Sequence, residues 1–551
     1  MALDQGQITH QITMNRIIAI LTLTVVASNI SAQTFTQYTT TEQQPWQTKG
    51  KVKLAPQTAL KGASKVVLSA DKSIVSPSGG ERGANTFRAW GTCFNELDLD
   101  AIRLLTKEEQ EKIMHDIFAP DGDLRFTRGR LSMNANDYSR AWYSCDTVAG
   151  DFALKYFNIE HDKENVIQLI KMAQRWQPAM TFWVSPWSPP AWMKINQDYC
   201  VASSPFNTQP KEKDYLLFCP PLTPPKGGEP SQTNQSLPLG GGQEGAVDPN
   251  EMQFANGQRG RLFPKRLASQ NYFIQDPRYL QAYANMFCKF IDLYKEEGIP
   301  IDMAMYQNEA YSYTPYPGCA WTAEGTLRFN RDYFIPTLRE KHPEVEICIG
   351  TLNTNRLDYV KQFIDGLKMQ VKGIGLQWEG RYIIDSLSHR YPDLHLISTE
   401  SECGNGQMDW RAGEHTFYLL HEYIGRGCDE YYNWNFILCD QGRSAWGWKQ
   451  NALVQVRSAN RTYRYTPEYY AYKHFSHFVE PGSTLLAFYP LKDGLQAIAF
   501  KRPDGKRVVI CGNSNNEAKS LSIEIVNRKP SNSKYLNINL APHSFNTFVE
   551  K

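Results

Sequence analysis

Two glutamates in this chain follow apolar, strand-like runs at positions where they could act as a pair. The run at residues 301–306 is followed by Gln-Asn-Glu, which ends in Glu309, and the run at 394–399 is followed directly by Glu400. Paired carboxyl groups can cleave a glycosidic bond, because one protonates the leaving oxygen while the other attacks the anomeric carbon. Attack with retention needs carboxyl groups roughly 5–5.5 Å apart, whereas a gap of about 6.5–9.5 Å admits water and gives inversion. The pair therefore predicts a glycosidase site, provided that the fold brings the two strand ends together; salt bridges at the rim of the fold are the alternative role for these glutamates.

An alternation of apolar runs and amphipathic stretches predicts the fold that would do so. Strands are expected at residues 87–92, 124–133, 180–184, 301–306, 345–350, 371–378, 394–399 and 428–436. Helical patterns include residues 164–176, 279–297, 326–341, 357–367 and 413–426. Eight strands, mostly followed by helices, indicate an α/β fold of the (β/α)8 TIM-barrel type, with reactive groups at the C-terminal strand ends. A doubly wound open sheet would alternate similarly, but no Gly-rich strand-to-helix turn with phosphate-binding spacing occurs.

Beyond Tyr469 the pattern changes to short strand-like runs that predict a β-sandwich side domain. These runs cover residues 495–502, 506–511, 520–525 and 544–549, with Pro503-Asp504-Gly505 as a hairpin turn. Residues 46–68 are also typical of strand, so the side domain is expected to be built from both chain ends. We assign residues 45–85 to its N-terminal strands, 87–455 to the barrel and 465–551 to its C-terminal part.

Two further segments have their own composition. Residues 1–32 are typical of a signal peptide, with a positive start at Met14-Asn15-Arg16, an apolar run too short to span a bilayer, and Ile30-Ser31-Ala32 before a polar Gln33. We therefore expect a secreted or periplasmic protein, cleaved after Ala32 and without integral membrane association. Residues 203–269 are rich in Pro, Gly, Gln and Ser and predict a disordered insertion after the third strand, with a structured lid as the alternative.

Composition narrows the expected partners. The 551 residues carry a formal net charge of +2 and no long Lys/Arg run, so nucleic acid is not an expected partner. No Cys/His cluster has metal-ligand spacing, and carboxylates alone can carry both steps of the reaction, so neither a metal nor another cofactor is expected. Cys200 and Cys219 flank one loop and could form a disulfide. Buried thiols are expected at Cys93, Cys348, Cys439 and Cys511.

Seven longer motifs occur in order along the chain. They are Arg130-Leu131-Ser132-Met133, Asn136-Asp137-Tyr138-Ser139, Ser185-Pro186-Trp187-Ser188-Pro189-Pro190, Gln307-Asn308-Glu309, Thr399-Glu400, Tyr432-Asn433-Trp434-Asn435 and His474-Phe475-Ser476. Together they resemble the glucosylceramidase-type enzymes of glycoside hydrolase family 30, from Phe87 to the C-terminus except for the insertion. The resemblance implies a retaining β-glycosidase with Glu309 as acid/base, Glu400 as nucleophile and a β-sandwich packed on the barrel. A carbohydrate or glycolipid substrate follows.

The same matching assigns further residues to the sugar subsite. Arg130, Asp137, Trp187 and Trp434 would line it, and Asn308 fits as a donor to the sugar 2-hydroxyl. Simpler roles stay open: Asp137 could cap a loop, either Trp could fill the core, and Arg130 could hold a carboxylate such as Glu400. Glu402 is a rival nucleophile, because residues two apart on a strand face the same side and only the motif match favours Glu400.

Two positions depart from the family pattern. Ala310 stands where the family usually has Pro, and Gln377-Trp378-Glu379 stands where it commonly has His-Trp-Tyr. We expect Trp378 to line the subsite and Glu379 to be a third carboxylate that binds sugar hydroxyls, with a rim ion pair as the alternative. The family implies glucosylceramide, β-1,6-glucan, and β-xyloside or β-fucoside substrates. The functional alternatives are a catalytically silent carbohydrate-binding barrel and an inverting hydrolase.

Overall fold

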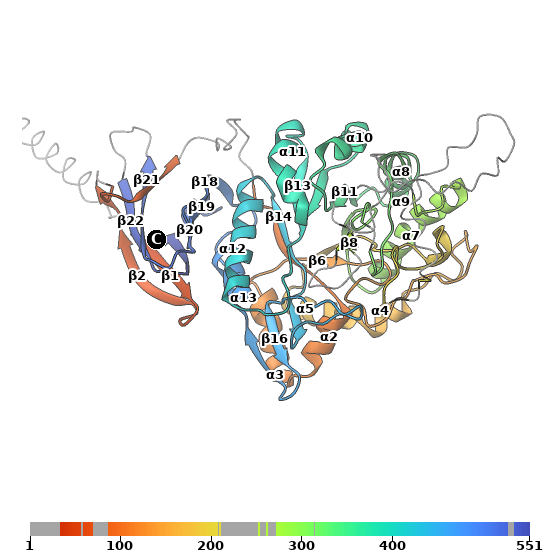
Figure 1. Cartoon of the computed structure of the whole chain (residues 1–551), viewed down its shortest axis with the longest axis horizontal. Coiled ribbons are helices and arrows are strands. Elements are labelled where there is room, and N and C mark those ends of the chain that lie inside the picture. Colours follow the sequence, from red (N-terminus) through yellow and green to blue (C-terminus); the bar gives the residue numbers. More distant parts are fainter. Residues whose placement is uncertain are drawn as a thin grey trace, which may run out of the picture.

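The computed structural model describes residues 34–56, 59–69, 86–205, 207, 209–210, 252–253, 261–262, 271–312, 314–526 and 534–551. Within these ranges the chain forms a closed barrel surrounded by helices and a separate group of mostly antiparallel sheets (Figure 1). The predicted signal peptide and most of the predicted insertion lie outside the described residues. None of the helices in the described ranges is long and apolar enough to cross a membrane.

Eight parallel strands close the barrel in chain order. They are β5 (Ala89–Cys93), β6 (Arg128–Leu131), β7 (Thr181–Val184), β10 (Ile301–Ala304), β11 (Glu346–Leu352), β12 (Gly373–Gln377), β13 (His395–Glu400) and β14 (Glu430–Asn433). The last strand pairs with the first, with Glu430 opposite Ala89 and Asn433 opposite Thr92. This closing pair excludes an open doubly wound sheet and confirms the predicted (β/α)8 barrel.

Several barrel strands are shorter than their apolar runs. The run at 124–133 contains the four-residue β6, and the run at 428–436 contains the four-residue β14. The flanking apolar residues are still buried, as are Leu124 and Phe126 before β6 and Trp434 and Phe436 after β14. The apolar runs therefore predicted burial correctly, but the hydrogen-bonded strands are shorter than the runs that contain them.

The helices agree with the predicted patterns in place and differ mainly at their ends. The predicted helix at 326–341 begins earlier, at Ala323 after the Thr322 cap, and contains a π-helical turn at Asn330–Phe334. Pro336 follows that turn and has no N–H to donate, which agrees with a local change of hydrogen bonding. The set comprises α2 (Glu96–Arg103), α3 (Lys107–Phe118), α4 (Glu160–Glu164), α5 (Val166–Trp176), α7 (Pro277–Glu296), α8 (Ala323–Phe329), α9 (Ile335–Lys341), α10 (Leu357–Leu367), α11 (Ile384–Arg390), α12 (Trp410–Gly425) and α13 (Pro467–Ser476).

The side domain packs two sheets face to face and uses both ends of the chain, as predicted. One sheet has the order β18-β19-β20-β23-β1-β2 and the other β3-β22-β21-β4. The chain ends meet where β1 pairs with β23, with Thr36 opposite Val549. Their inner faces form a separate apolar core. The strands are β1 (Thr34–Thr41), β2 (Gln47–Lys53), β3 (Ala55–Pro56), β4 (Ser64–Ser69), β18 (Thr484–Lys492), β19 (Leu495–Lys501), β20 (Arg507–Asn513), β21 (Lys519–Val526), β22 (Lys534–Leu540) and β23 (Ser544–Glu550).

Two boundaries of this domain differ from the prediction. Its first strand starts at Thr34 rather than near residue 45, because β1 is built mainly from threonines, which pack in strands but do not form an apolar run. At the other end, α13 packs against barrel helix α12, so the sandwich resumes at β18, later than residue 465. The predicted strand at 46–68 is divided into β2, β3 and β4, and residues 70–85 lie outside the described part.

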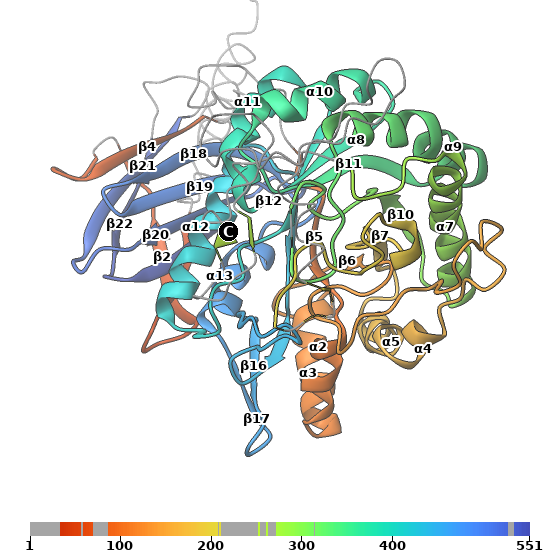
Figure 2. The same cartoon turned by 45° about the vertical axis from the view of Figure 1, so that its right-hand side comes forward.

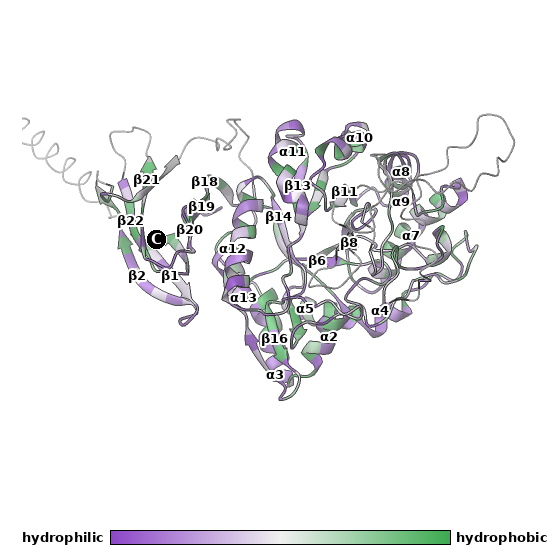
Figure 3. Cartoon of the chain, in the orientation of Figure 1, coloured by the Kyte–Doolittle hydropathy of each residue, from purple (hydrophilic) through white to green (hydrophobic). Residues whose placement is uncertain are grey.

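The α12 and α13 helices lie between the barrel and the sandwich (Figures 1 and 2). Buried His474 on α13 contacts Thr547 Oγ1 through Nδ1 at 2.8 Å and Thr40 Oγ1 through Nε2 at 2.9 Å. Burial lowers the pKa of His474 to about 3, so the ring joins the two domains as a neutral group. Much of the ribbon of α11 is coloured as hydrophilic in Figure 3.

Candidate active site

Glu309 lies at the C-terminal end of the barrel in a left-handed backbone conformation. The strand β10 ends at Ala304, and the chain reaches Glu309 with φ 46°. Such a conformation costs a non-glycine residue about 1–3 kcal/mol and persists where the surroundings hold it. Here the Glu309 N–H donates to the carbonyl of Thr351, near the end of β11, at 3.2 Å. The neighbouring strand therefore fixes the direction of the Glu309 side chain.

The Glu309 carboxylate is buried among neutral donors. Asn353 Nδ2 donates to Oε1 at 2.7 Å, Gln377 Nε2 donates to the same oxygen at 3.0 Å, and the Tyr316 hydroxyl donates to Oε2 at 3.3 Å. Only 4% of Glu309 is exposed. These contacts orient the carboxyl group without a cation among them.

Glu400 is the last residue of β13 and has an ionic partner. Arg130 Nη1 donates to Oε2 at 2.8 Å, and Trp378 Nε1 donates to Oε1 at 3.0 Å. Burial raises the pKa of Glu400, Arg130 opposes this effect, and the nearby negative charge of Glu309 raises the pKa further. The two glutamates thus differ in environment and influence each other electrostatically.

One amide nitrogen contacts both carboxylates. Gln377 Nε2 lies 3.0 Å from Glu309 Oε1 and 3.4 Å from Glu400 Oε2. The distance between these two oxygens cannot exceed the sum of the two contact distances. That sum is below roughly 6.5 Å, the separation at which the spacing of inverting pairs begins. The fold therefore brings together the pair that the sequence singled out.

Glu402, the rival of Glu400, belongs to a different cluster. Because β13 ends at Glu400, strand alternation does not extend to residue 402. The Glu402 carboxylate forms an ion pair with Arg381 and contacts His415 Nε2 at 2.8 Å. The contacts with Arg130 and Gln377 are made by Glu400.

Arg130 is 1% exposed. Its guanidinium contacts the carboxylate of Glu400 and is not open to solvent. Beyond its bond to Glu400, its Nη2 donates to Asn308 Oδ1 at 2.7 Å, and its guanidinium lies 4.3 Å from the Trp187 ring centroid. These contacts match the alternative that the sequence left open, a partner for Glu400. Asn308 Oδ1 also accepts from Thr351 Oγ1 at 2.8 Å, so the Asn308 amide is firmly oriented.

The other predicted subsite residues gather beside this pair. Trp187 and Trp434 are buried and stack at 5.2 Å between ring centroids. Asp137 is 4% exposed; burial, followed by the charge of Glu400, raises its pKa well above the ordinary range. Asp137 Oδ1 and Trp434 Nε1 are buried and find no hydrogen-bond partner within the described residues. Such orphaned polar atoms are uncommon and are expected where a ligand supplies the missing partner.

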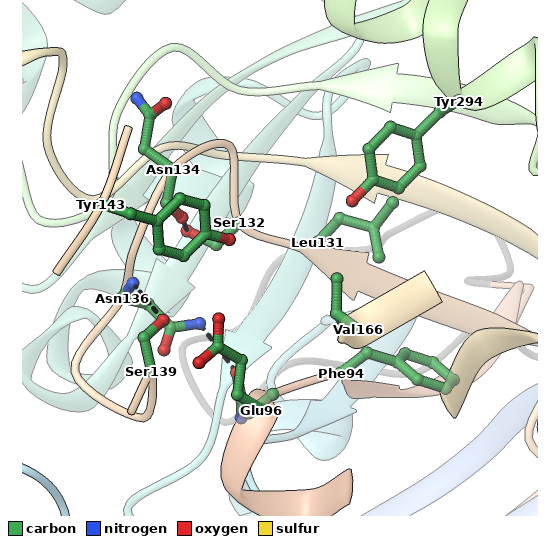
Figure 4. A pocket seen from close by; sticks show the side chains of 11 residues that line it. Phe94, Glu96, Leu131, Ser132, Asn134, Asn136, Ser139, Tyr143, Val166 and Tyr294 are labelled. Carbon is green, nitrogen blue, oxygen red and sulfur yellow. Dashed lines mark hydrogen bonds between the residues drawn. The ribbon is translucent and has the colours of Figure 1, made fainter. Parts of the chain in front are cut away.

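The loop that carries Asp137 is anchored by a chain of amides. Asn136 Nδ2 donates to Asn95 Oδ1 at 2.8 Å, and Asn95 Nδ2 donates to Asn435 Oδ1 at 3.0 Å. Asn136 and Ser139 also line a small cavity between this loop and α2 (Figure 4). None of the predicted site residues lines that cavity, which is therefore distinct from the carboxylate pair.

Trp378 and Glu379 follow β12 and have different surroundings. Trp378 has φ 47° at the start of a 3-10 helix (η6, Trp378–Ile383) and donates to Glu400. The Glu379 carboxylate accepts from Asn355 Nδ2 at 3.0 Å, an amide rather than the cation of a rim ion pair. The Glu379 N–H donates to Asn353 Oδ1 at 3.2 Å, so Glu379 directly contacts a hydrogen-bond partner of Glu309.

Several residues that contact the pair had no predicted role. Gln377 was recognised only as a departure from the family pattern, and Asn353 belongs to no motif. Tyr316 begins an aromatic arc, in which the Tyr316–Trp446 and Trp446–Trp448 centroids are each 4.9 Å apart and the Trp448–Trp378 centroids 5.9 Å apart. The two ends of this arc donate to Glu309 and Glu400. The Trp-Gly-Trp triplet after the eighth strand was the available sign of it.

Eight cysteines of the described ranges are free thiols, namely Cys93, Cys145, Cys200, Cys288, Cys319, Cys348, Cys439 and Cys511. Cys93, Cys348 and Cys511 are buried as predicted, whereas Cys439 is only partly buried because it lies on the short edge strand β15 (Ile437–Cys439). Cys200 is buried and unpaired, and its predicted partner Cys219 lies outside the described residues. The described residues contain no group of three or more His, Cys, Asp or Glu side chains that could hold a metal ion.

A parallel barrel with two carboxylates at its C-terminal strand ends defines the class of protein, and comparison with known proteins defines the family. Residues 87–213 and 270–479 match the TIM-barrel domain of glycosyl hydrolase family 30, and residues 482–548 match its beta sandwich domain. The chain therefore belongs to glycoside hydrolase family 30 and is a glycosidase.

Individual relatives are distant but aligned over most of their length. The chain is 22% identical to lysosomal acid glucosylceramidase of Mus musculus, over 80% of this chain and 78% of the relative. It is 20% identical to an endo-1,6-beta-D-glucanase of Neurospora crassa, again over 80% of each chain. The crystal structure of SrfJ from Salmonella typhimurium superposes with a TM-score of 0.71 at 17% identity, covering 94% of this chain and 99% of SrfJ.

Proposed function

We propose that this glycosidase cleaves β-glycosidic bonds with retention by double displacement. In the first step Glu309 protonates the leaving oxygen while Glu400 attacks the anomeric carbon and forms a glycosyl–enzyme ester. In the second step Glu309 takes a proton from water, which displaces Glu400. The single observation that carries this proposal is the Gln377 amide nitrogen within hydrogen-bond distance of both carboxylates. No metal or other cofactor takes part in either step.

The electrostatics support one shared proton. Each carboxylate disfavours a second negative charge beside it, so protonation of Glu309 removes the charge that raises the pKa of Glu400. Arg130 then stabilises the ionised Glu400. A protonated Glu309 beside an ionised Glu400 is the state that the first step requires.

The polar atoms beside the pair suit a sugar ring. Asp137 Oδ1 can accept from a hydroxyl, and Trp434 Nε1 can donate to one. Because Asn308 Oδ1 is held by Arg130 and Thr351, the Nδ2 group of Asn308 is the donor that we assign to the 2-hydroxyl. Binding a hydroxylated ring would satisfy buried groups that otherwise lack partners.

For the substrate we propose a β-glucoside of the glucosylceramide or β-1,6-glucan type, with β-xyloside or β-fucoside specificity as the alternative. The glucosylceramidase and endo-1,6-beta-D-glucanase relatives support the first choice. We further propose that residues 1–32 direct export, which N-terminal sequencing of secreted protein would test by finding Gln33 as the first residue.

Three measurements test the reaction. Rates on a panel of aryl β-glycosides are compared for the wild type, Glu309→Gln and Glu400→Gln, and equal background rates for all three would indicate a catalytically silent binder. Proton NMR of the first-formed anomer is expected to show β-product from β-substrate, and α-product would demonstrate inversion. Azide should restore the turnover of a Glu309→Ala variant on an activated substrate, because the small anion attacks the glycosyl–enzyme without needing a base.

A further inference from the structure

The amide of Gln377, at the end of β12, is held in one orientation between the carboxylates. Gln377 is fully buried, and its Nε2 lies 3.0 Å from Glu309 Oε1, 3.4 Å from Glu400 Oε2 and 3.3 Å from Asn308 Oδ1. Thr399 Oγ1 lies 3.1 Å from Gln377 Oε1 and donates to it. The flipped amide would point a carbonyl oxygen at two carboxylates, so the NH2 group must face them.

The number of hydrogen atoms decides which contacts this NH2 group makes. A primary amide has two N–H bonds, and three acceptors surround this one. Asn308 Oδ1 already accepts from Arg130 Nη2 at 2.7 Å and from Thr351 Oγ1 at 2.8 Å, which uses both lone pairs of a carbonyl oxygen. The two N–H bonds of Gln377 are therefore left for the carboxylates, one for each.

We propose that Gln377 is a positioning residue that sets the gap between Glu309 and Glu400 and lowers their mutual repulsion without adding a charge. The inference rests on the proposed function, since only a nucleophile and an acid/base that cooperate need a fixed gap. It acts through the two glutamates and not through the substrate.

The absence of charge on Gln377 matters because the surroundings already contain several charged or titratable groups. Arg130 from β6 contacts Glu400, Asp137 follows β6 nearby, and the Tyr316 hydroxyl contacts Glu309. Glu379 lies behind Asn353, and Cys93 of β5 is next to Arg130. A second cation between the glutamates would favour the doubly ionised pair and so withdraw the proton needed in the first step.

A histidine at this position would behave differently. A neutral imidazole has one N–H and could not donate to both carboxylates, and below about pH 6.5 the ring becomes a cation. Glutamine supplies two donors at every pH. The pH dependence of this glycosidase should therefore be set by its carboxyl groups, without an additional ionisation between them.

Substitutions at Gln377 test the inference through the pH profile of kcat/KM. Gln377→Met keeps the approximate volume and removes both N–H bonds. We expect kcat/KM to fall about 10- to 100-fold, the range for lost hydrogen bonds to charged groups. The acidic limb should move up by about one pH unit, because Glu400 loses a donor that favours its ionised form. Gln377→His should retain more activity above pH 7 than the Met variant and should show an added ionisation near about pH 6.5.

Gln307→Met is the matched control. Gln307 is also fully buried, but its Nε2 donates to the backbone carbonyls of Trp187 at 2.6 Å and Asn308 at 2.9 Å. This variant loses a buried amide without removing a donor from either carboxylate, so the limbs of its pH profile should stay in place whatever its activity. Melting temperatures establish that each variant is folded.

The outcomes separate the inference from the proposed function. If the limbs of the Gln377→Met pH profile lie at the same pH values as in the wild type, the inference is overturned, because the loss of activity would then be structural. If the Met variant does not fold, a Gln377→His profile without an added ionisation overturns it instead. Full activity in Glu309→Gln or Glu400→Gln would contradict the proposed function itself, a result that no Gln377 variant can produce.

Discussion

The two ends of the barrel both carry buried charges, but they pair these charges to different extents. At the N-terminal strand ends Arg88 lies 2.9 Å from Glu346 and 3.2 Å from Glu430, and Arg128 pairs with Asp302 and with Glu430 at 3.5 Å. Two cations thus face three carboxylates in a continuous network. At the C-terminal ends, the contacts recorded among the described residues pair Glu400 with the cation Arg130, while Glu309 accepts from the neutral donors Asn353, Gln377 and Tyr316.

The pKa values follow this difference. Burial alone would raise the pKa of Glu346, but Arg88 lowers it below the ordinary range. At the opposite end burial raises the pKa of Glu400 in spite of Arg130. The first arrangement favours the ionised form of Glu346, whereas the second disfavours the ionised form of Glu400, and perturbed pKa values of the second kind are typical of functional sites.

The largest expected effect is at the catalytic end. Glu400→Gln should lower kcat by about 10,000-fold, because the variant has no nucleophile. Its free energy of unfolding should change little, since the amide oxygen can still accept from Arg130 while one of two repelling charges is removed. Activity assays and urea denaturation measure the two quantities. If Glu400→Gln lowered the free energy of unfolding by as much as it lowers transition-state stabilisation, the contrast between the two barrel ends would disappear.

Glu430→Gln should give the reverse result at the N-terminal end. Glu430 is fully buried, and neutralising it removes the carboxylate that Arg88 and Arg128 share, so we expect about 3 kcal/mol of lost stability. The kcat of the folded protein should stay within about threefold of wild type, because the network lies at the opposite end from Glu309 and Glu400. Urea denaturation and single-temperature kinetics measure both, and a large fall in kcat without destabilisation would contradict the prediction.

These contrasts also show what the sequence could and could not predict. The alternation of apolar runs predicted the barrel, and the bounds of α10 agree with the predicted 357–367, because periodicity reports burial directly. The exclusion of Glu402 depended on where β13 stops pairing, which an apolar run does not reveal. The role of Gln377 depends on atoms at the ends of β10, β12 and β13 that lie close together in the fold. No local sequence pattern predicts this proximity.

A smaller effect concerns the pH dependence of stability. The pKa of Asp137 is raised in the folded state, so its ionisation disfavours folding, and stability falls as pH rises above its ordinary value of about 3.9. Asp137→Asn should therefore be more stable than wild type at pH 7, with the difference shrinking towards pH 4. Thermal melts at both pH values measure this, and hydrolysis should weaken about 10- to 100-fold through the lost hydroxyl contact.

Glu346→Gln is the control of opposite sign. The lowered pKa of Glu346 adds stability above its ordinary value of about 4.3, and that stability is lost as pH falls through the folded-state value. The Gln variant should therefore be less stable than wild type at pH 7 and approach it in acid. If both variants shift in the same direction, the two barrel ends do not differ as we infer.

The smallest effect should come from the aromatic arc. Trp446 is 3% exposed, and its Nε1 has no hydrogen-bond partner within the described residues. Trp446→Phe keeps an aromatic ring against Tyr316 and removes one donor that could reach a sugar hydroxyl. We expect KM to rise about 3- to 10-fold with little change in kcat, the size of one hydrogen bond to a neutral group.

Trp410→Phe gives the matched control for this last effect. Trp410 Nε1 is also buried without a partner in the described part of the chain, but its ring stacks on Phe545 of the sandwich at 4.7 Å. Removing that indole N–H should leave KM unchanged. Equal KM changes in both variants would mean that unpaired indole groups report general packing. An orphaned polar atom would then mark a sugar contact only where it lies beside the carboxylate pair.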